Sequence, residues 1–178
     1  MTNADTQIRL IRPEDAAELT RIISQSADHL RPWEPQRDFS FYTQSRQLEL
    51  IEAALASAES GTTVPFVIES YEGEILGRLT LSGVTRGALQ SCALSYWVRA
   101  DRLRRGHASR AVMLAVVHAF ERLELHRIQA ETLPENVASQ TVLRAAGFSL
   151  FGFAPQYLRI DGVWRDHLMF QLLNRAFK

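Results

Sequence analysis

The sequence lacks features that several common classes of protein require. It holds one cysteine, Cys92, so no internal disulfide can form, and we expect a protein of the reducing cytoplasm. No uninterrupted apolar run approaches the ~18–20 residues that span a bilayer. The first residues, Met1 to Asp5, show neither the basic region nor the apolar core of a secretory signal. We therefore expect neither membrane association nor secretion.

An excess of one charge is also missing. Twenty basic residues balance twenty acidic ones, whereas proteins that bind bulk nucleic acid usually carry a basic excess. The arginines are concentrated locally instead, because Arg99, Arg102, Arg104 and Arg105 crowd one short segment. This cluster suits a small polyanionic ligand better than a long one, although a solvated basic loop has the same composition. No cysteine or carboxylate lies at metal-ligand spacing around the histidines, so we expect no metal site.

Length and patterning favour one α/β domain. The 178 residues are 46% hydrophobic and 22% charged, which is ordinary for a globular domain. No linker, repeat or low-complexity segment interrupts them. Hydrophobic periodicity predicts helices over residues 13–24, 42–57, 108–123 and 138–146 and a loop over 30–38. It predicts strands over residues 6–12, 65–70, 75–82, 88–98, 127–133, 151–160 and 163–172, the last two joined by a turn at Asp161-Gly162.

One strand, turn and helix N-terminus together form a candidate anion site. The predicted strand ends at Tyr96-Trp97-Val98-Arg99, and Arg104-Arg105-Gly106-His107-Ala108-Ser109 opens the next helix. Unpaired amides in a first helical turn and the helix dipole favour a phosphate there. This is not a Walker loop, because no Gly-Lys-Ser/Thr follows, and only one glycine of the dinucleotide fingerprint is present. A plain turn before a helix remains the simpler interpretation of this segment alone.

A second pattern downstream changes that interpretation. A predicted strand over residues 127–133 is followed by Asn136-x-x-Ser139 and a helix that ends at Gly147-Phe148. Together with Arg105-Gly106-His107-Ala108-Ser109, this order resembles the acetyl-coenzyme A core of the GCN5-related N-acetyltransferases (GNAT). Three further runs resemble the RimJ branch, the ribosomal-protein alanine N-acetyltransferases. They are His29 to Pro35, Val84 to Gly87 and Tyr157 to His167.

The resemblance implies a fold and a coenzyme. We expect a single GNAT-type domain over residues 1–178, with a mixed, mostly antiparallel twisted sheet flanked by helices around the strand-turn-helix core. Acetyl-CoA would be the cosubstrate, with its diphosphate held by the amides of Arg104 through Ser109 and its pantetheine arm paired with the backbone of Trp97, Val98 and Arg99. Asn136 would touch the same arm. The family usually has Gln or Arg three residues before the motif glycine, where this chain has Leu103, so we expect weaker affinity.

Catalytic candidates follow from the chemistry of acetyl transfer. An amide near Val98 would polarise the thioester carbonyl, unless it is an ordinary ladder amide. The resemblance places Ser139 close to the coenzyme sulfur as the general acid, and its alternative role is helix capping. Glu131 and Glu34 are candidate bases acting through water, with Asp166 a third. An α-amino group has an unperturbed pKa of about 7.7–8, so a dedicated base is not required.

The acceptor end is predicted from aromatic and acidic residues near the two ends of the chain. Trp33, Glu34, Tyr96, Trp164 and Asp166 would bind the acceptor, although core packing accounts for the tryptophans equally well. We expect an N-α-acetyltransferase, a monomer or homodimer, acting directly on a protein N-terminus, an alanine of a ribosomal protein by resemblance. Two alternatives remain at this point: a small-molecule amine or aminoacyl-antibiotic acetyltransferase, and a coenzyme-binding module without turnover.

Overall fold

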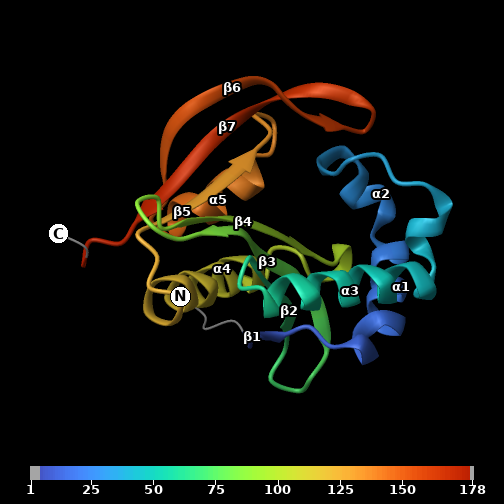
Figure 1. Ribbon diagram of the computed structural model, residues 1–178. Helices are drawn as coiled ribbons and strands as arrows, with labels where there is room; N and C mark the ends of the chain where they lie inside the picture. Colours follow the sequence, from blue (N-terminus) through green and yellow to red (C-terminus); the bar gives the residue numbers. More distant parts are fainter. Residues whose placement is uncertain (1–4, 177–178) are drawn as a thin grey trace.

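A twisted sheet forms the centre of the molecule. The computed structural model describes residues 5–176, and these form a seven-stranded sheet in the order β1-β2-β3-β4-β5-β7-β6 (Figure 1). Neighbouring strands are antiparallel except β4 and β5, which run parallel. The predicted mixed, mostly antiparallel sheet is therefore confirmed. The strands are β1 (Gln7–Leu10), β2 (Thr63–Glu69), β3 (Ile75–Thr85), β4 (Ser91–Val98), β5 (Arg127–Thr132), β6 (Ser149–Ile160) and β7 (Val163–Leu173).

The four predicted helices are present, and the structure adds the short helix α2, which was not predicted, and two tighter or wider turns. The helices are α1 (Ala16–Gln25), α2 (Ala27–Leu30), α3 (Gln44–Glu59), α4 (His107–Val117) and α5 (Val137–Ala145). The expected loop over 30–38 begins with a 3-10 turn at Arg31–Trp33. The helix expected to run to residue 123 changes after Val117 into a π-helical turn, His118–Arg122. Hydrophobic periodicity cannot distinguish these tighter and wider turns, because each preserves the buried face.

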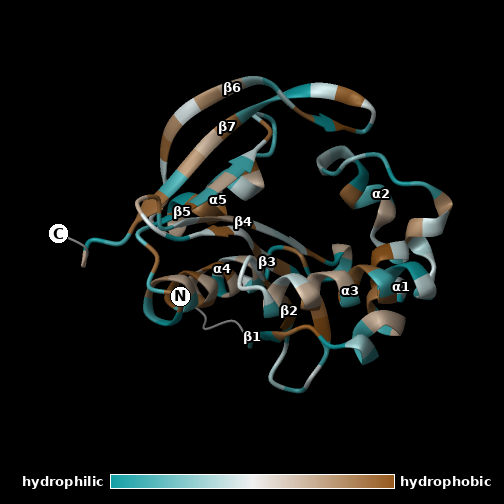
Figure 2. Cartoon of the chain, viewed as in Figure 1, coloured by the Kyte–Doolittle hydropathy of each residue, from teal (hydrophilic) through white to brown (hydrophobic). Residues whose placement is uncertain are grey.

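Two hydrophobic clusters lie on opposite faces of the sheet. Phe66 and Ile68 pack with α4 and α5, whereas Val67 between them packs with α1 and α3. Successive strand residues point to opposite faces, so β2 is buried on both sides. Figure 2 shows hydrophobic residues in this central region and also along β6 and β7, where Phe153 and Trp164 are exposed. The N-terminal half of the sheet is therefore covered on both faces, and the C-terminal hairpin is more open.

The β6–β7 hairpin reaches across to the N-terminal loop. Its turn has Asp161 at φ 44° and Gly162 at φ 81°, as expected for a two-residue turn with both residues left-handed. The Asp161 amide donates to the Glu34 carbonyl at 3.0 Å. Figure 1 shows the tip of this hairpin approaching the α2 region from the far end of the sheet. Segments distant in the sequence thus meet at one end of the molecule.

Candidate active site

The turn between β4 and α4 presents a run of unpaired amides. Arg104 (φ 57°) and Gly106 (φ 84°) both adopt the left-handed conformation, which is uncommon for an arginine. No side chain caps α4. Leu103 and Arg104 form a hydrogen-bonded turn, whereas the amides of residues 106–109 meet no acceptor within the described part of the chain, and the Arg110 amide is the next to bond, to the Gly106 carbonyl. The predicted phosphate-holding segment therefore forms one continuous turn suited to an anion.

The arginines around this turn divide into two kinds. Arg104 and Arg105 are exposed and make no side-chain hydrogen bond to described residues. Arg99 is only 6% exposed, and its guanidinium contacts Glu74 at 3.0 Å and Asp101 at 2.6 Å. The Arg99 amide donates to the Leu76 carbonyl at 2.8 Å. Both donor groups of Arg99 therefore have protein partners, and its expected contact with the coenzyme stays a prediction.

β4 and β5 separate after three paired residues. Ser91, Cys92 and Ala93 pair with residues 127–129, and beyond them the two strands share no register. The Arg99 amide bonds to β3, and the hydrogen-bonding direction alternates along a strand. The amide and carbonyl of Trp97 therefore also point to β3, whereas those of Tyr96 and Val98 point toward β5. The Trp97 backbone is thus paired with β3, and its expected contact with the pantetheine arm stays a prediction. The Val98 amide points toward β5 at a position where β5 no longer pairs with β4. This amide is the candidate donor to the thioester carbonyl.

Ser139 lies beside this opening. The Asn136 side chain accepts from the Ser139 amide at 3.0 Å, so Asn136 is the N-cap of α5. The Ser139 hydroxyl does no capping and lies 3.0 Å from the Tyr96 hydroxyl. Burial raises the pKa of Tyr96 to about 12, so this phenol stays protonated at neutral pH. The pair places Tyr96 on the α5 face of the sheet, and its expected contact with the acceptor stays a prediction.

Glu131 lies on the face of the sheet opposite Ser139. Its neighbours Ile128 and Ala130 pack in the cluster beneath α4 and α5, so alternation along β5 turns Glu131 away from Ser139. Burial raises the pKa of the Glu131 carboxyl. Burial and the nearby Glu131 charge together raise the pKa of Tyr157 on β6. Glu131 and Tyr157 therefore share a partly desolvated region on the face opposite Ser139.

Glu34 borders a cavity at the junction of the N-terminal loop and the hairpin. The cavity has a volume of about 230 Å³ and is lined by Ile23, Ala27, Leu30, Arg31, Glu34, Pro35, Gln36, Arg37, Tyr42 and Asp161. The Glu34 carboxylate lies 3.8 Å from Arg37. Burial nevertheless raises the pKa of Glu34. Glu34 thus combines partial burial with access to a space that an acceptor could enter.

The remaining acceptor candidates are less concentrated than expected. The Asp166 carboxylate accepts from the Gln156 amide at 2.8 Å, at the point where the register of β6 shifts, so its contact is structural. Trp164 is 60% exposed and Trp33 36% exposed, so neither is core. The structure therefore separates the predicted residues into a Ser139–Tyr96 group, a Glu131–Tyr157 group and a Glu34–Asp161 group.

Three residues near the site were missed by the sequence reasoning. Glu74 binds Arg99 and Arg102 from the β2–β3 turn, and Arg78 on β3 is a partly buried cation that Glu34 stabilises. The Thr6 hydroxyl lies 2.7 Å from His107 Nδ1. Burial, followed by Arg105 and Arg102, lowers the pKa of His107, which keeps its ring neutral. None of these pairs has a sequence signal, because the partners are far apart along the chain.

Residues 5–176 lack two further features, a cluster of metal ligands and a membrane-spanning helix. This part of the chain contains no group of three or more histidine, cysteine, aspartate or glutamate residues placed to hold a metal ion. None of its helices has the length and hydropathy needed to cross a membrane. Cys92 is 2% exposed, and burial raises the pKa of its thiol to about 12, so it is an inert core residue.

Comparison with known proteins connects this geometry to a family. The model of the acetyltransferase (GNAT) domain matches residues 6–149. The probable N-acetyltransferase YjcK of Bacillus subtilis is 31% identical over 168 residues, which cover 94% of this chain and 93% of that protein. The [ribosomal protein uS5]-alanine N-acetyltransferase of Escherichia coli is 31% identical over 163 residues, covering 91% of this chain and 84% of the relative.

A solved structure agrees in fold. Mycobacterium smegmatis RimJ in complex with CoA-disulfide superposes with a TM-score of 0.93 at 37% identity, covering 97% of this chain and 83% of that one. The expected GNAT fold, the RimJ resemblance and the prediction of an enzyme are all confirmed. A module that only binds coenzyme is accordingly set aside. The chain belongs to the GNAT acetyltransferase family and is an N-acetyltransferase related to the RimJ enzymes.

Proposed function

We propose that this enzyme transfers acetyl from acetyl-CoA directly to the α-amino group of a protein N-terminus, an alanine of a ribosomal protein. The observation that carries the proposal is the opening between β4 and β5, which has the phosphate turn at one end and the Ser139–Tyr96 pair beside it. The substrate follows the E. coli relative, whose name specifies an alanine of ribosomal protein uS5. A thioester held in this opening is accessible to an amine from the Glu131 face.

The coenzyme is held mainly by backbone groups. The amides of residues 104–109 bind the diphosphate, and the exposed Arg104 and Arg105 add positive charge beside it. Val98 and Tyr96 offer the β4 backbone groups that can pair with the pantetheine arm. Leu103 is 37% exposed and brings no charge to the turn. Backbone amides hold the coenzyme. The presence of Leu103 at the position where the family usually has Gln or Arg therefore weakens acetyl-CoA binding without abolishing it.

Ser139 serves as the proton donor to the leaving thiolate. The amine attacks the thioester carbonyl and a C–N bond forms. As the C–S bond breaks, the sulfur takes the proton of the Ser139 hydroxyl, and the nitrogen, positively charged after the attack, returns a proton to Ser139 Oγ through water. Tyr96 remains protonated and its hydroxyl lies 3.0 Å from Ser139 Oγ, so when Tyr96 donates this hydrogen bond the Ser139 proton is free to face the sulfur. Asn136 fixes the helix start on which Ser139 sits. The Val98 amide stabilises the oxyanion of the tetrahedral intermediate.

The amine loses its proton to Glu131 or Glu34 through water, or directly to solvent. Burial raises the pKa of both carboxyls, which makes each a better proton acceptor than an exposed glutamate. Glu131 is on the strand that borders the opening, and Glu34 is at the cavity between the N-terminal loop and the hairpin. Whichever of these two carboxylates does not act as the base attracts the incoming ammonium group of the acceptor.

Acceptor competition tests the proposed substrate. Thiol release from acetyl-CoA is measured with short peptides that differ only at residue one and with a panel of small amines and aminoacyl nucleotides. The proposal predicts rapid turnover on alanine-first peptides and little on the panel. Turnover on small amines alone would overturn it and assign the enzyme to the small-molecule class.

A further inference from the structure

The phosphate turn has no side-chain support of its own. Leu103, Arg104 and Arg105 make no side-chain hydrogen bond or ion pair with described residues, although the turn contains two left-handed residues. Its shape must therefore be maintained from its two ends. The Thr6–His107 contact lies at the downstream end, and an ion-pair network lies at the upstream end.

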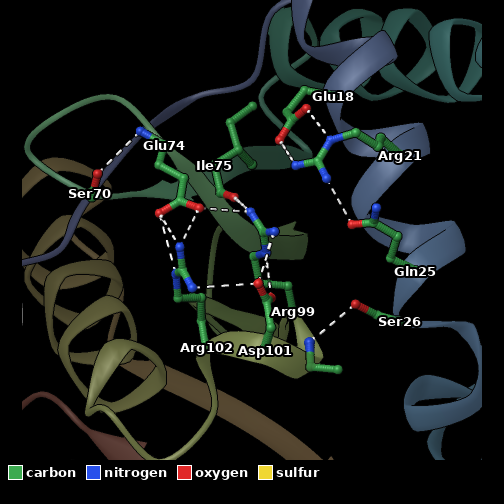
Figure 3. A network of polar contacts seen from close by, with 11 residues as sticks. Glu18, Arg21, Gln25, Ser26, Ser70, Glu74, Ile75, Arg99, Asp101 and Arg102 are labelled. Atoms are coloured by element: carbon green, nitrogen blue, oxygen red, sulfur yellow. Dashed lines mark hydrogen bonds and ion pairs between the residues drawn. The ribbon is translucent and has the colours of Figure 1, made fainter.

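Glu74 is the centre of the upstream network (Figure 3). Its carboxylate accepts from Arg99 at 3.0 Å and from Arg102 at 2.9 Å and 3.1 Å. Asp101 closes the network through Arg99 at 2.6 Å and Arg102 at 3.5 Å. One carboxylate thus ties together Arg99, which precedes the 3-10 turn Ala100–Arg102, and Arg102, which ends it, just before the phosphate turn.

Glu74 is itself held rigidly. The Ser70 amide donates to the Glu74 carbonyl at 2.9 Å, and the Glu74 amide donates to the Ser70 hydroxyl at 3.2 Å. On the other side of the network, the buried Ser26 hydroxyl accepts from the Ala100 amide at 3.1 Å. Figure 3 shows Glu74, Arg99, Arg102 and Ser26 converging from the β2–β3 turn, the segment after β4 and the end of α1. The segment that leads into the phosphate turn is therefore fixed from three sides.

We propose that Glu74 is a positioning residue for coenzyme binding: by clamping Arg99 and Arg102 it holds the turn so that the amides of residues 104–109 face the diphosphate. The inference rests on the proposed assignment of this turn to the diphosphate. Glu74 touches no part of the coenzyme in this account and acts only through the two arginines.

The sign of its effect distinguishes positioning from simple charge. A carboxylate near a polyanion repels it, so by Coulomb's law alone Glu74→Gln should tighten coenzyme binding. If Glu74 positions the turn, the same substitution releases Arg102, loosens the amides and weakens binding. The two explanations predict opposite changes in KM for acetyl-CoA.

The experiment compares two acetyl donors. With acetyl-CoA, Glu74→Gln should raise KM about ten-fold with kcat nearly unchanged, the change that a loss of ~1.4 kcal/mol of binding produces. With S-acetylpantetheine, which has no diphosphate, the variant should match the unmodified enzyme. Glu72→Gln, an exposed neighbour on the same β2–β3 turn, is the control and should change neither donor. A lower or unchanged KM for acetyl-CoA, or an equal loss with both donors, would overturn the proposal.

A third variant separates this inference from the turn assignment beneath it. Gly106→Glu places a carboxylate in the turn itself, and calorimetry measures CoA binding while a thermal melt reports folding. If Gly106→Glu folds and binds CoA normally, the turn assignment fails, and the role of Glu74 fails with it. If Gly106→Glu folds but no longer binds CoA, and Glu74→Gln does not raise KM for acetyl-CoA, only the proposed role of Glu74 is wrong.

Discussion

The proposed coenzyme half and the proposed acceptor half of the site are built in different ways. The coenzyme half consists of backbone amides on one turn and of Ser139 and Asn136 on one helix start, all within two short motifs. The acceptor half is assembled from a loop near residue 34, the middle of β5 and the distant hairpin. Backbone amides can bind the coenzyme in any sequence that forms the turn, whereas the side chains that line the acceptor half can change from one sequence to another. One donor can therefore be kept while the acceptor varies, which is how function comes to reside in a site and not in a fold.

The largest expected effect comes from breaking the coenzyme half at Gly106. Gly106 lies at φ 84°, so Gly106→Glu introduces backbone strain and a negative charge beside the diphosphate. CoA affinity measured by calorimetry should fall at least about 100-fold, because each tenfold loss needs only ~1.4 kcal/mol. The control is Gly87→Glu, an exposed glycine at φ 69° outside the site, which should keep full affinity.

The next effect separates chemistry from binding within the same half. Ser139→Ala should lower kcat about 100-fold, the scale of a lost general acid, and should leave KM for acetyl-CoA nearly unchanged. Thr141→Ala, an exposed residue on the same helix whose hydroxyl bonds to the Val137 carbonyl, should leave both parameters alone. A variant Ser139→Ala that keeps its kcat would show that Ser139 is not the acid.

A third variant tests the backbone alignment from which the site is built. A Cβ on Gly77 would collide with the Trp97 carbonyl oxygen, so this glycine permits the close approach of β3 to β4. Gly77→Ala should reduce the free energy of unfolding in urea by about 1–3 kcal/mol, as overpacked sites do. The matched control is Gly152→Ala on β6, where the nearest atom would be at an ordinary 3.7 Å. Equal stability of the two variants would contradict the tight β3–β4 contact.

The smallest expected effect probes the acceptor half through pH. Burial raises the pKa of Glu131, so the folded protein favours the protonated carboxyl. That preference contributes stability below the unfolded pKa of about 4.3, and the contribution is lost as the pH rises through the folded pKa. Glu131→Gln should therefore raise Tm at pH 7 and leave it unchanged at pH 4, whereas Glu52→Gln on the exposed face of α3 should change Tm at neither pH. A fall in Tm at pH 7 would show that the charged form is the favoured one.

The same contrast explains what the sequence could predict. The phosphate turn and the Asp161-Gly162 turn depend on contiguous residues, so their patterns could be recognised. The position of Tyr96 also had a signal, because Cys92, Leu94, Tyr96 and Val98 alternate onto one face of β4 and meet α5 there. The aromatic character of Tyr96 alone predicts an acceptor contact, whereas this alternation predicts the α5 face.

Other features had no local signal. The sequence places Arg99 in a cluster suited to a polyanion, whereas its partner in the structure is Glu74, 25 residues away. The Thr6–His107 pair spans 101 residues. The π-helical turn at His118–Arg122 keeps the same buried face as an α-helix, so periodicity does not predict it. Ion pairs and side-chain contacts over such separations depend on the completed fold.

A structure of the enzyme with CoA would test the central claim most directly. The account predicts the diphosphate on the amides of residues 104–109, the pantetheine arm alongside Val98 and the sulfur within hydrogen-bond distance of Ser139 Oγ, with Arg99 still bound to Glu74. A coenzyme that lay elsewhere, or a sulfur distant from Ser139, would contradict it.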